Sequence, residues 1–449
     1  MIGIIGRLVR GECLVEKDNK GKRDVAGLHQ GLVEQLVRVG NIRTTAVEAA
    51  FRAVPRHIFL PELSAEEVYR DEAIATKFLN GSAISSSSQP AIMAIMLEQL
   101  ELQPGQRVLE IGAGTGYNAA LMAHIVGDTG RVVTVDLDDD TAQRAREHLA
   151  AAGFDGVQVV CSDGGLGYAD AAPYDRIILT VGARDIMPAW HEQLKPGGRL
   201  LLPLSIRDTQ LSVAFEKVGD HLASLSARAA GFMLLRGAFG ESGIHTQLGP
   251  DPGLYLQFGE RRLVDTKGVY SLVTGTRGAS QDFPTNVQVL SNEVFYNLSI
   301  WLALYEPDFC HLSVEGARME RGILPNLFRS FATKNTSSST VGLLGETTVC
   351  LLVHHADAGT SVNDSGSGCN GGFAQVYELF VRKFGPDDAL ALRLVEQIHA
   401  WDKAGRPGDE KVRIRAYPYD SDYVPVENEI VIQKRWTRLV ISWDIYETM

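Results

Sequence analysis

Three glycines at alternate positions follow one apolar run and precede another, and this pattern carries the clearest chemical signal in the chain. The segment is Val-Leu-Glu-Ile-Gly-Ala-Gly-Thr-Gly at residues 108–116. Its first residues predict a buried strand, and apolar residues at helical spacing after it predict a helix. Because glycine has no Cβ, Gly112, Gly114 and Gly116 permit unusual dihedrals and close approach of a ligand to the turn. A strand, glycine turn and helix in this order favour a nucleotide-type ligand.

The spacing of these glycines, and the acid before them, favour a sulfonium cofactor over a dinucleotide. Dinucleotide enzymes use Gly-x-Gly-x-x-Gly, whereas this turn has Gly-x-Gly-x-Gly. Glu110 stands before the first glycine, where its charge repels a pyrophosphate but attracts the amino group of a methionine moiety. We therefore predict that S-adenosylmethionine is bound by Glu110, Gly112, Ala113, Gly114 and Gly116.

Two aspartates end the next two predicted strands, and ligands gather at the carboxyl ends of the strands of a parallel sheet. Asp136 is placed to bind both ribose hydroxyls, and Leu137 follows it at the same edge. Asp163 can accept a hydrogen bond from the adenine amino group, and Gly164 can pack beside the ring. Each aspartate alone is explained equally well as a cap or turn residue. Their order after the glycine turn favours binding, so all four residues are predicted cofactor ligands.

Strands and helices alternate after the glycine turn, which predicts a doubly wound, Rossmann-like α/β fold of the class I methyltransferase type. A chain of 449 residues is expected to form more than one domain. We predict a helical N-terminal cap with a serine-rich loop over residues 1–104 and the cofactor-binding core over 105–240. Residues 241–449 carry no second cofactor motif and predict a separate α+β domain, with peptide recognition as its expected role.

Within residues 241–449, the pattern predicts both regular elements and loops. Apolar periodicity predicts helices at 292–305 and 389–401 and a buried strand at 349–354. Serine, glycine and asparagine are frequent at 334–340 and 357–372, which predicts two loops there.

The composition narrows the class of protein further. A formal net charge of −12 opposes non-specific binding to nucleic acid, and no apolar run approaches the roughly 20 residues that span a bilayer. The first residues lack the features of a secretion signal. Five scattered cysteines without a Cys-x-x-Cys pair fit a reducing compartment and give a zinc site little support. We predict a cytoplasmic protein without a metal, a membrane segment or a nucleic-acid partner.

Several segments together resemble the protein-L-isoaspartate O-methyltransferase family over roughly residues 28–218. The segments are Ala-Val-Pro-Arg-His-Ile-Phe at 53–59, the glycine motif, Pro-Tyr-Asp-Arg-Ile at 173–177 and Gln-Leu-Lys-Pro-Gly-Gly-Arg at 193–199. The resemblance implies a carboxyl O-methyltransferase that uses S-adenosylmethionine, releases S-adenosylhomocysteine and acts on a peptide or protein carrying aspartate or isoaspartate. Small-molecule or nucleic-acid methylation, and a binding module with a degenerate cofactor site, are the competing interpretations.

The family has a Thr-Ile-Ser-Gln-Pro-like segment whose serine hydroxyl lies beside the methylated carboxylate. Here residues 81–90 are Gly-Ser-Ala-Ile-Ser-Ser-Ser-Ser-Gln-Pro, so Ile-Ser matches at 84–85 and Ser-Gln-Pro at 88–90. We favour Ser88 as the catalytic serine, because its distance from Pro90 and the next helix is fixed. Ser87 and Ser85 are the alternatives, and Ser86 remains open. A polar loop without a catalytic serine is the competing interpretation.

The altered serine segment and the long C-terminal extension resemble a branch of the family that tailors ribosomally synthesised, modified peptides of the lanthipeptide or graspetide type. That resemblance implies methylation of an aspartate in a precursor peptide, which promotes succinimide (aspartimide) formation and can yield isoaspartate. The alternative is repair of isoaspartyl residues in damaged proteins. Either reaction needs no general base, because a carboxyl group with a pKa of about 3.9 is ionised at neutral pH.

Overall fold

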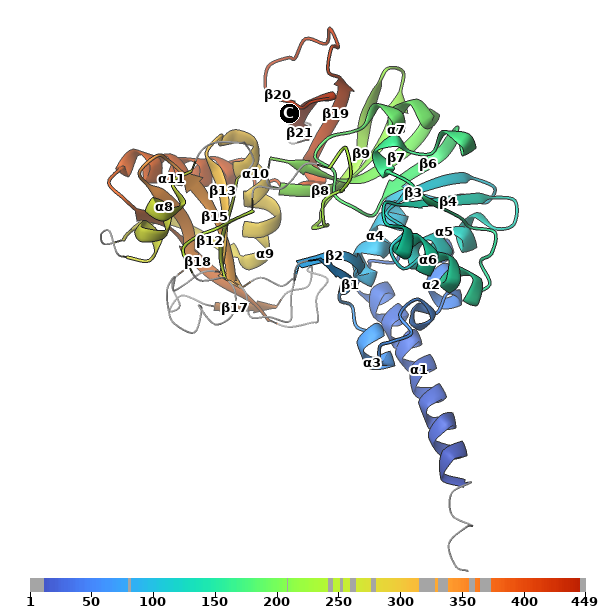
Figure 1. Cartoon of the computed structure of the whole chain (residues 1–449). Coiled ribbons are helices and arrows are strands. Elements are labelled where there is room, and N and C mark those ends of the chain that lie inside the picture. The colour runs from blue at the N-terminus through green and yellow to red at the C-terminus, as the bar shows by residue number, and fades with distance from the viewer. Residues whose placement is uncertain are drawn as a thin grey trace, which may run out of the picture. The chain divides into compact units, whose positions relative to one another are not determined.

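The structure is a computed structural model in which two compact units are resolved (Figure 1). It describes residues 12–79, 82–207, 209–240, 245–250, 253–258, 264–275, 280–314, 328–329, 338–354, 360–363 and 373–444. The first unit comprises Met1–Val181 and Met187–Leu201, and the second comprises Gly182–Ile186 and Leu202–Met449. Among the described residues, no helix is long and apolar enough to cross a membrane.

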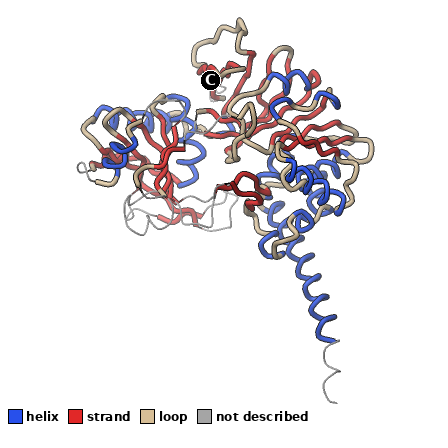
Figure 2. The backbone as a smooth tube through the Cα atoms, viewed as in Figure 1, coloured by secondary structure: helices blue, strands red, loops and turns tan. Residues whose placement is uncertain are grey.

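The chain before the first hairpin is helical, as the sequence predicts for a cap (Figure 2). Its elements are α1 (Glu12–Arg38), α2 (Thr45–Ala53), the 3-10 helix η1 (Arg56–Phe59) and α3 (Ala65–Val68). The Thr44 hydroxyl accepts a hydrogen bond from the Val47 amide and so caps α2. A Glu98 carboxylate oxygen accepts from the amides of Arg43 and Thr44 at 2.8 and 2.9 Å. Because Glu98 lies in the later helix α4 (Pro90–Leu100), this contact ties the cap to α4.

The serine-rich segment forms the second strand of a hairpin. The strands β1 (Ile74–Leu79) and β2 (Ser82–Ser87) pair antiparallel, with Lys77 opposite Ser85. Helix α4 begins at Pro90, where proline is favoured because its missing N–H has no helical partner.

Five parallel strands form the core of the first unit and confirm the predicted doubly wound fold. Their order is β7-β6-β3-β4-β5. They are β3 (Arg107–Ile111), β4 (Arg131–Asp136), β5 (Gln158–Cys161), β6 (Tyr174–Leu179) and β7 (Leu194–Ile206). The connections contain α5 (Tyr117–Val126), α6 (Asp139–Ala151), η2 (Gly164–Leu166), η3 (Ala169–Ala171) and α7 (Pro188–Gln193). Apolar residues of β3 and β4 are buried on both faces, which is typical of parallel sheets.

The second unit contains two strands that follow β7 in the chain and the last three strands of the chain. They are β8 (Thr209–Val218), β9 (His221–Ala229), β19 (Val412–Pro418), β20 (Ile430–Gln433) and β21 (Thr437–Trp443). The strand β19 pairs with β9, and β21 lies between β19 and β20 in the strand order. The division of the chain therefore differs from the predicted boundary at 240/241, because strands beyond residue 411 share a sheet with strands that end before residue 230.

The remaining strands of the second unit form a separate antiparallel sheet with the central order β10-β11-β13-β15-β16-β18-β12. Its strands are β10 (His245–Gln247), β11 (Leu254–Phe258), β12 (Gln281–Leu290), β13 (Phe309–Val314), β14 (Phe328–Arg329), β15 (Ser338–Leu344), β16 (Val349–His354), β17 (Thr360–Asn363) and β18 (Phe373–Phe384). The helical segments are α8 (Thr266–Val273), α9 (Ser291–Glu293), η4 (Val294–Leu298), α10 (Ser299–Tyr305), α11 (Asp388–Lys403) and η7 (Asp409–Lys411).

The two predicted helices and the strand at 349–354 are confirmed, whereas the loop predictions are wrong in part. Residues 338–340 lie in β15 and residues 360–363 lie in β17. The rest of both stretches lies outside the described residues. Polar residues form a strand here because adjacent strands pair with their backbone groups, and a neighbouring carbonyl can accept from a buried hydroxyl. The buried Thr340 hydroxyl donates to the Leu352 carbonyl at 2.5 Å, for example.

Candidate active site

The segments that carry the predicted cofactor ligands leave the sheet at one edge. Ile111 of β3 is in register with Val135 of β4 and with Leu179 of β6, and Asp136 of β4 is in register with Cys161 of β5. Because the strands are parallel, the turns after β3, β4 and β5 emerge side by side. The structure therefore places the glycine turn, Asp136 and the segment after β5 together, as the sequence predicts.

The glycine turn has a backbone conformation that other residues rarely adopt. The φ angles of Gly112, Gly114 and Gly116 are 104°, 53° and 88°. A Cβ on Gly112 would lie 2.6 Å from the Thr180 Oγ1 atom, which leaves no room for a side chain. The amides of Gly112 and Ala113 donate to one carbonyl of β4 at 2.8 and 3.1 Å. The turn is thus fixed by its own backbone, and Ala113 is buried within it.

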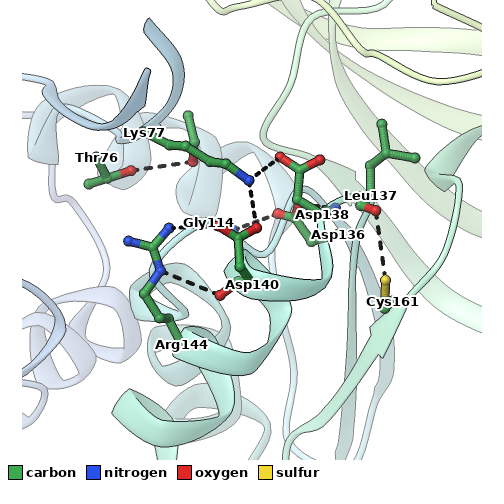
Figure 3. A network of polar contacts seen from close by, with 10 residues as sticks. Thr76, Lys77, Gly114, Asp136, Leu137, Asp138, Asp140, Arg144 and Cys161 are labelled. Carbon is green, nitrogen blue, oxygen red and sulfur yellow. Dashed lines mark hydrogen bonds and ion pairs between the residues drawn. The ribbon is translucent and has the colours of Figure 1, made fainter. Parts of the chain in front are cut away.

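Asp136 joins the glycine turn to the segment after β4. Its Oδ2 atom accepts from the Gly114 amide at 3.0 Å, and its Oδ1 atom accepts from the Asp138 amide at 3.2 Å (Figure 3). Each carboxylate oxygen thus accepts from one backbone amide, and the carboxylate lies at the carboxyl end of β4, where ligands of parallel sheets gather. Leu137 contributes its carbonyl to a contact of 3.7 Å with the Cys161 thiol. This arrangement fits the predicted ribose site.

The segment after β5 is also fixed by short-range contacts. Asp163 caps the 3-10 helix η2, because its Oδ1 atom accepts from the Gly165 amide at 2.9 Å. Gly164 is buried, and its carbonyl accepts from the Trp190 indole N–H at 2.9 Å. Asp163 is therefore a cap residue of η2. Its place at the carboxyl end of β5 is also compatible with the predicted adenine contact.

Glu110 lies in a buried hydrogen-bond network next to the glycine turn. It is fully buried, and its two oxygens accept from Asn118 Nδ2 at 2.7 Å and from Thr134 Oγ1 at 2.6 Å. Side chains alternate along a strand, so Glu110 points toward α5, which carries Asn118. Burial raises the pKa of Glu110 to about 7, although both hydrogen bonds oppose the shift. These contacts join β3 to β4 and α5, and the contact of Glu110 with an amino group stays a prediction.

The serine segment lies against the glycine turn, and its hydroxyls differ in their contacts. The Ser86 carbonyl would lie 3.5 Å from a Cβ on Gly114. Ser85 accepts from the Thr76 hydroxyl at 3.3 Å, and the buried Ser87 hydroxyl accepts from Arg56 Nη2 at 3.3 Å. The Ser88 hydroxyl has no hydrogen-bond partner among the residues that the structure describes. Of the three predicted serines, Ser88 is thus the one whose hydroxyl makes no hydrogen bond within the described residues, whereas the hydroxyls of Ser85 and Ser87 act as acceptors.

Arg56 holds the serine segment, a role that the sequence alone did not suggest. Its fully buried guanidinium donates to the carbonyls of Val68, Arg70, Glu72 and Ser88 at 2.9 to 3.3 Å. Burial lowers the pKa of Arg56. The only signal in the sequence is its position within the segment at 53–59, which carries the family resemblance.

Asp71 fixes the start of α4, two residues beyond Ser88. Its Oδ1 atom accepts from the Ala91 amide at 2.8 Å, and its Oδ2 atom accepts from Gln89 Nε2 at 3.1 Å. An acid at a helix N-terminus satisfies amides that lack a helical partner. Arg56 and Asp71 together therefore fix the backbone on both sides of Ser88.

The residues at this edge suit S-adenosylmethionine. The bare glycine backbone and the Asp136 carboxylate at the end of β4 match a nucleoside with ribose hydroxyls. No group of three potential His, Cys, Asp or Glu ligands for a metal occurs within the described ranges.

The comparisons with known proteins agree with this geometry. The family model for protein-L-isoaspartate(D-aspartate) O-methyltransferase matches residues 27–233. A protein-L-isoaspartate O-methyltransferase of Methanopyrus kandleri is 43% identical over 190 residues, which are 42% of this chain and 82% of that protein. Protein-L-isoaspartate O-methyltransferase 2 of Archaeoglobus fulgidus is 38% identical over 209 residues, 46% of this chain and 93% of that protein.

One solved structure entitled protein-L-isoaspartate O-methyltransferase has a TM-score of 0.46 and 23% identity, and the match covers 86% of this chain and 96% of that one. The argument for the family rests on the sequence relatives, of which the chain covers most of the length. The chain belongs to the protein-L-isoaspartate O-methyltransferase family and is a carboxyl O-methyltransferase that uses S-adenosylmethionine.

Proposed function

We propose that the enzyme methylates the side-chain carboxylate of an aspartyl residue in a modified, ribosomally synthesised precursor peptide. The observation that carries the carboxylate-binding part of the proposal is the Ser88 hydroxyl, which makes no hydrogen bond within the described residues and lies two residues after Ser86, whose carbonyl lies against Gly114. The cofactor is held by the glycine turn, Asp136 and the segment at Asp163.

Methyl transfer to a carboxylate requires the protein to align the carboxylate with the methyl group, and it requires no proton transfer. An aspartyl carboxylate with a pKa of about 3.9 is already a nucleophile at neutral pH. S-adenosylmethionine supplies a methyl group on a sulfonium, and the protein must place one carboxylate oxygen in line with it and exclude water. The Ser88 hydroxyl donates to the other carboxylate oxygen and so fixes the direction of the reacting one.

The ester then reacts within the peptide. The amide nitrogen of the following residue attacks the ester carbonyl, a succinimide ring closes, and the methoxy group leaves with the amide proton as methanol. The final peptide has lost the equivalent of one water relative to the aspartyl peptide. Hydrolysis of the ring gives aspartate or isoaspartate.

Two features of the sequence support a dedicated peptide over damaged proteins. The segment before Gln89 contains four consecutive serines, a departure from the Thr-Ile-Ser pattern of the family. The matched region ends at residue 233, so a large part of the second unit is added to the methyltransferase core. We propose that this added part recognises the precursor peptide.

Repair of isoaspartyl residues is the second candidate function. The names of the relatives favour it, since each is a protein-L-isoaspartate O-methyltransferase. In that case the same ester forms on an isoaspartyl carboxylate, and ring closure returns part of the peptide to aspartate.

Mass spectrometry of two acceptors separates the candidates. The enzyme is incubated with S-adenosylmethionine and either an isoaspartyl model peptide or the precursor peptide encoded beside its gene, before and after cyclisation. We expect a gain of one methyl group and then a net loss of one water only on the cyclised precursor. Methylation of the isoaspartyl peptide alone would refute the tailoring function and establish repair.

A further inference from the structure

Lys77 connects the serine hairpin to the segment that follows β4. Its ammonium lies 2.8 Å from Asp138 Oδ2 and 2.5 Å from Asp140 Oδ1 (Figure 3). Lys77 belongs to β1, while Asp138 and Asp140 follow the predicted ribose ligand Asp136. The ion pair therefore spans two segments that are far apart in the sequence.

The two carboxylates contribute unequally. The side chains of Lys77 and Asp138 are 23% and 19% exposed, whereas Asp140 is 61% exposed and also lies 3.6 Å from Arg144. Water and salt weaken exposed ion pairs, so Asp138 is the more important partner. Burial lowers the pKa of Lys77, but the hydrogen bonds with both aspartates outweigh it and raise the pKa above its ordinary value.

Contacts at both ends of the pair lead to the active site. On the hairpin, Lys77 is opposite Ser85, and the next residue, Ser86, places its carbonyl against Gly114. On the other side, the Asp138 amide donates to the same Asp136 carboxylate that accepts from Gly114. The ion pair thus closes a ring of contacts around the hairpin, the glycine turn and the end of β4.

We propose that the Lys77–Asp138 ion pair is a positioning device for methyl transfer, which holds the serine hairpin in register with the cofactor site. Lys77 is a positioning residue, because it acts on the acceptor carboxylate only through the hairpin. The inference rests on the proposed role of Ser88, which follows the hairpin directly. A misplacement of reacting groups by about 1 Å is enough to reduce a rate strongly.

The test compares kcat/KM for the modified peptide with the affinity for S-adenosylmethionine. Lys77→Met and Asp138→Asn are each expected to lower kcat/KM about tenfold, as for a lost charged hydrogen bond. Their combination should also lose about tenfold, since both changes remove one interaction. Lys77→Arg should restore activity to within about threefold of wild type, and the Kd of S-adenosylmethionine in Lys77→Met should change less than about threefold.

Lys195→Met is the matched control. Lys195 forms an ion pair of 2.6 Å with Asp175. Asp175 is the second residue of β6, so this pair lies at the amino end of the parallel strands, opposite the edge that carries the glycine turn. The substitution removes the same charge and one ion pair, so kcat/KM should stay within about twofold of wild type.

Three results would overturn the inference. Activity of Lys77→Met within about twofold of wild type, with Ser88→Ala inactive, would refute the positioning role and leave the proposed function intact. A hundredfold loss in the double variant would show that the two residues act independently. Wild-type kcat/KM in Ser88→Ala would refute the proposed role of the serine and, with it, the alignment assigned to Lys77.

Discussion

The glycine turn and the serine hairpin both belong to the active site, yet they are fixed in different ways. The turn is fixed locally, by left-handed glycines and by amides that bond to the adjacent strand. The hairpin and the residues that follow it are fixed by side-chain contacts between distant residues. The Arg56 guanidinium bonds to Ser87 and Ser88, the Asp71 carboxylate bonds to Ala91, and Lys77 of the hairpin pairs with Asp138. Cofactor binding should therefore depend on backbone geometry, and acceptor alignment on long-range side-chain contacts.

The largest effect is expected in the glycine turn. In Gly112→Ala, the new Cβ would approach Thr180 Oγ1 to 2.6 Å at a φ of 104°. Strain and overpacking of about 3 kcal/mol predict an affinity for S-adenosylmethionine about a hundredfold weaker, measured by calorimetry. Gly156→Ala is the control, since a Cβ there meets no atom within 4 Å. Unchanged affinity in Gly112→Ala would remove the contrast between the two regions.

The next largest effect is expected at Ser88. Ser88→Ala removes a hydrogen bond to a charged carboxylate, so kcat should fall about 10- to 100-fold while the Kd of S-adenosylmethionine is kept. Ser85→Ala should retain kcat to within about threefold, because Ser85 lies within β2, whereas Ser88 lies just before the fixed start of α4. Steady-state kinetics on the modified peptide measures both variants. A larger loss in Ser85→Ala would assign the acceptor to the wrong serine.

Arg56→Lys tests how strongly the hairpin depends on a distant side chain. Lysine presents its donors at one point and cannot span the carbonyls that the guanidinium reaches. We expect about 2 kcal/mol lower stability and about tenfold lower kcat/KM, with the affinity for S-adenosylmethionine nearly unchanged. Thermal unfolding measures the stability, steady-state kinetics measures kcat/KM, and calorimetry measures the affinity for S-adenosylmethionine. A tenfold loss of affinity for S-adenosylmethionine would show that cofactor binding also depends on the side chains that hold the hairpin.

The smallest effect on activity is expected at Glu110. The pKa of this buried carboxyl is about 7 in the folded chain, above the ordinary 4.5, so its neutral form favours folding. This contribution is complete below about pH 4.5 and is lost as the pH rises through about 7. Glu110→Gln should be less sensitive to pH over that window in thermal unfolding, with activity within about threefold of wild type. A parallel pH dependence in both proteins would contradict the raised pKa.

The same contrast explains which parts the sequence could predict. The glycines, the strand ends at Asp136 and Asp163 and the alternating core follow from local patterns, and the structure agrees with them. The contacts of Glu110 with Asn118 and Thr134 were not predictable, because the direction of a side chain depends on which elements cover each face of the sheet. Arg56 and Lys77 were missed because their partners are distant in sequence.

The second unit shows the same limit on a larger scale. Strand β19 begins at Val412, yet it pairs with β9, which ends at Ala229. Composition also failed at Ser338–Thr340, where polar residues form part of a buried strand because neighbouring strands supply hydrogen bonds. Pairing between distant strands leaves no signature in a local pattern.

The most direct test of the account is a crystal structure with S-adenosylhomocysteine and an acceptor peptide bound. We expect the Ser88 hydroxyl within about 3.0 Å of one oxygen of the aspartyl or isoaspartyl carboxylate, the usual range for such a hydrogen bond. The adenosyl group should lie on the glycine turn, with its ribose at Asp136. A carboxylate held by another residue, with Ser88 turned away from it, would contradict the central claim.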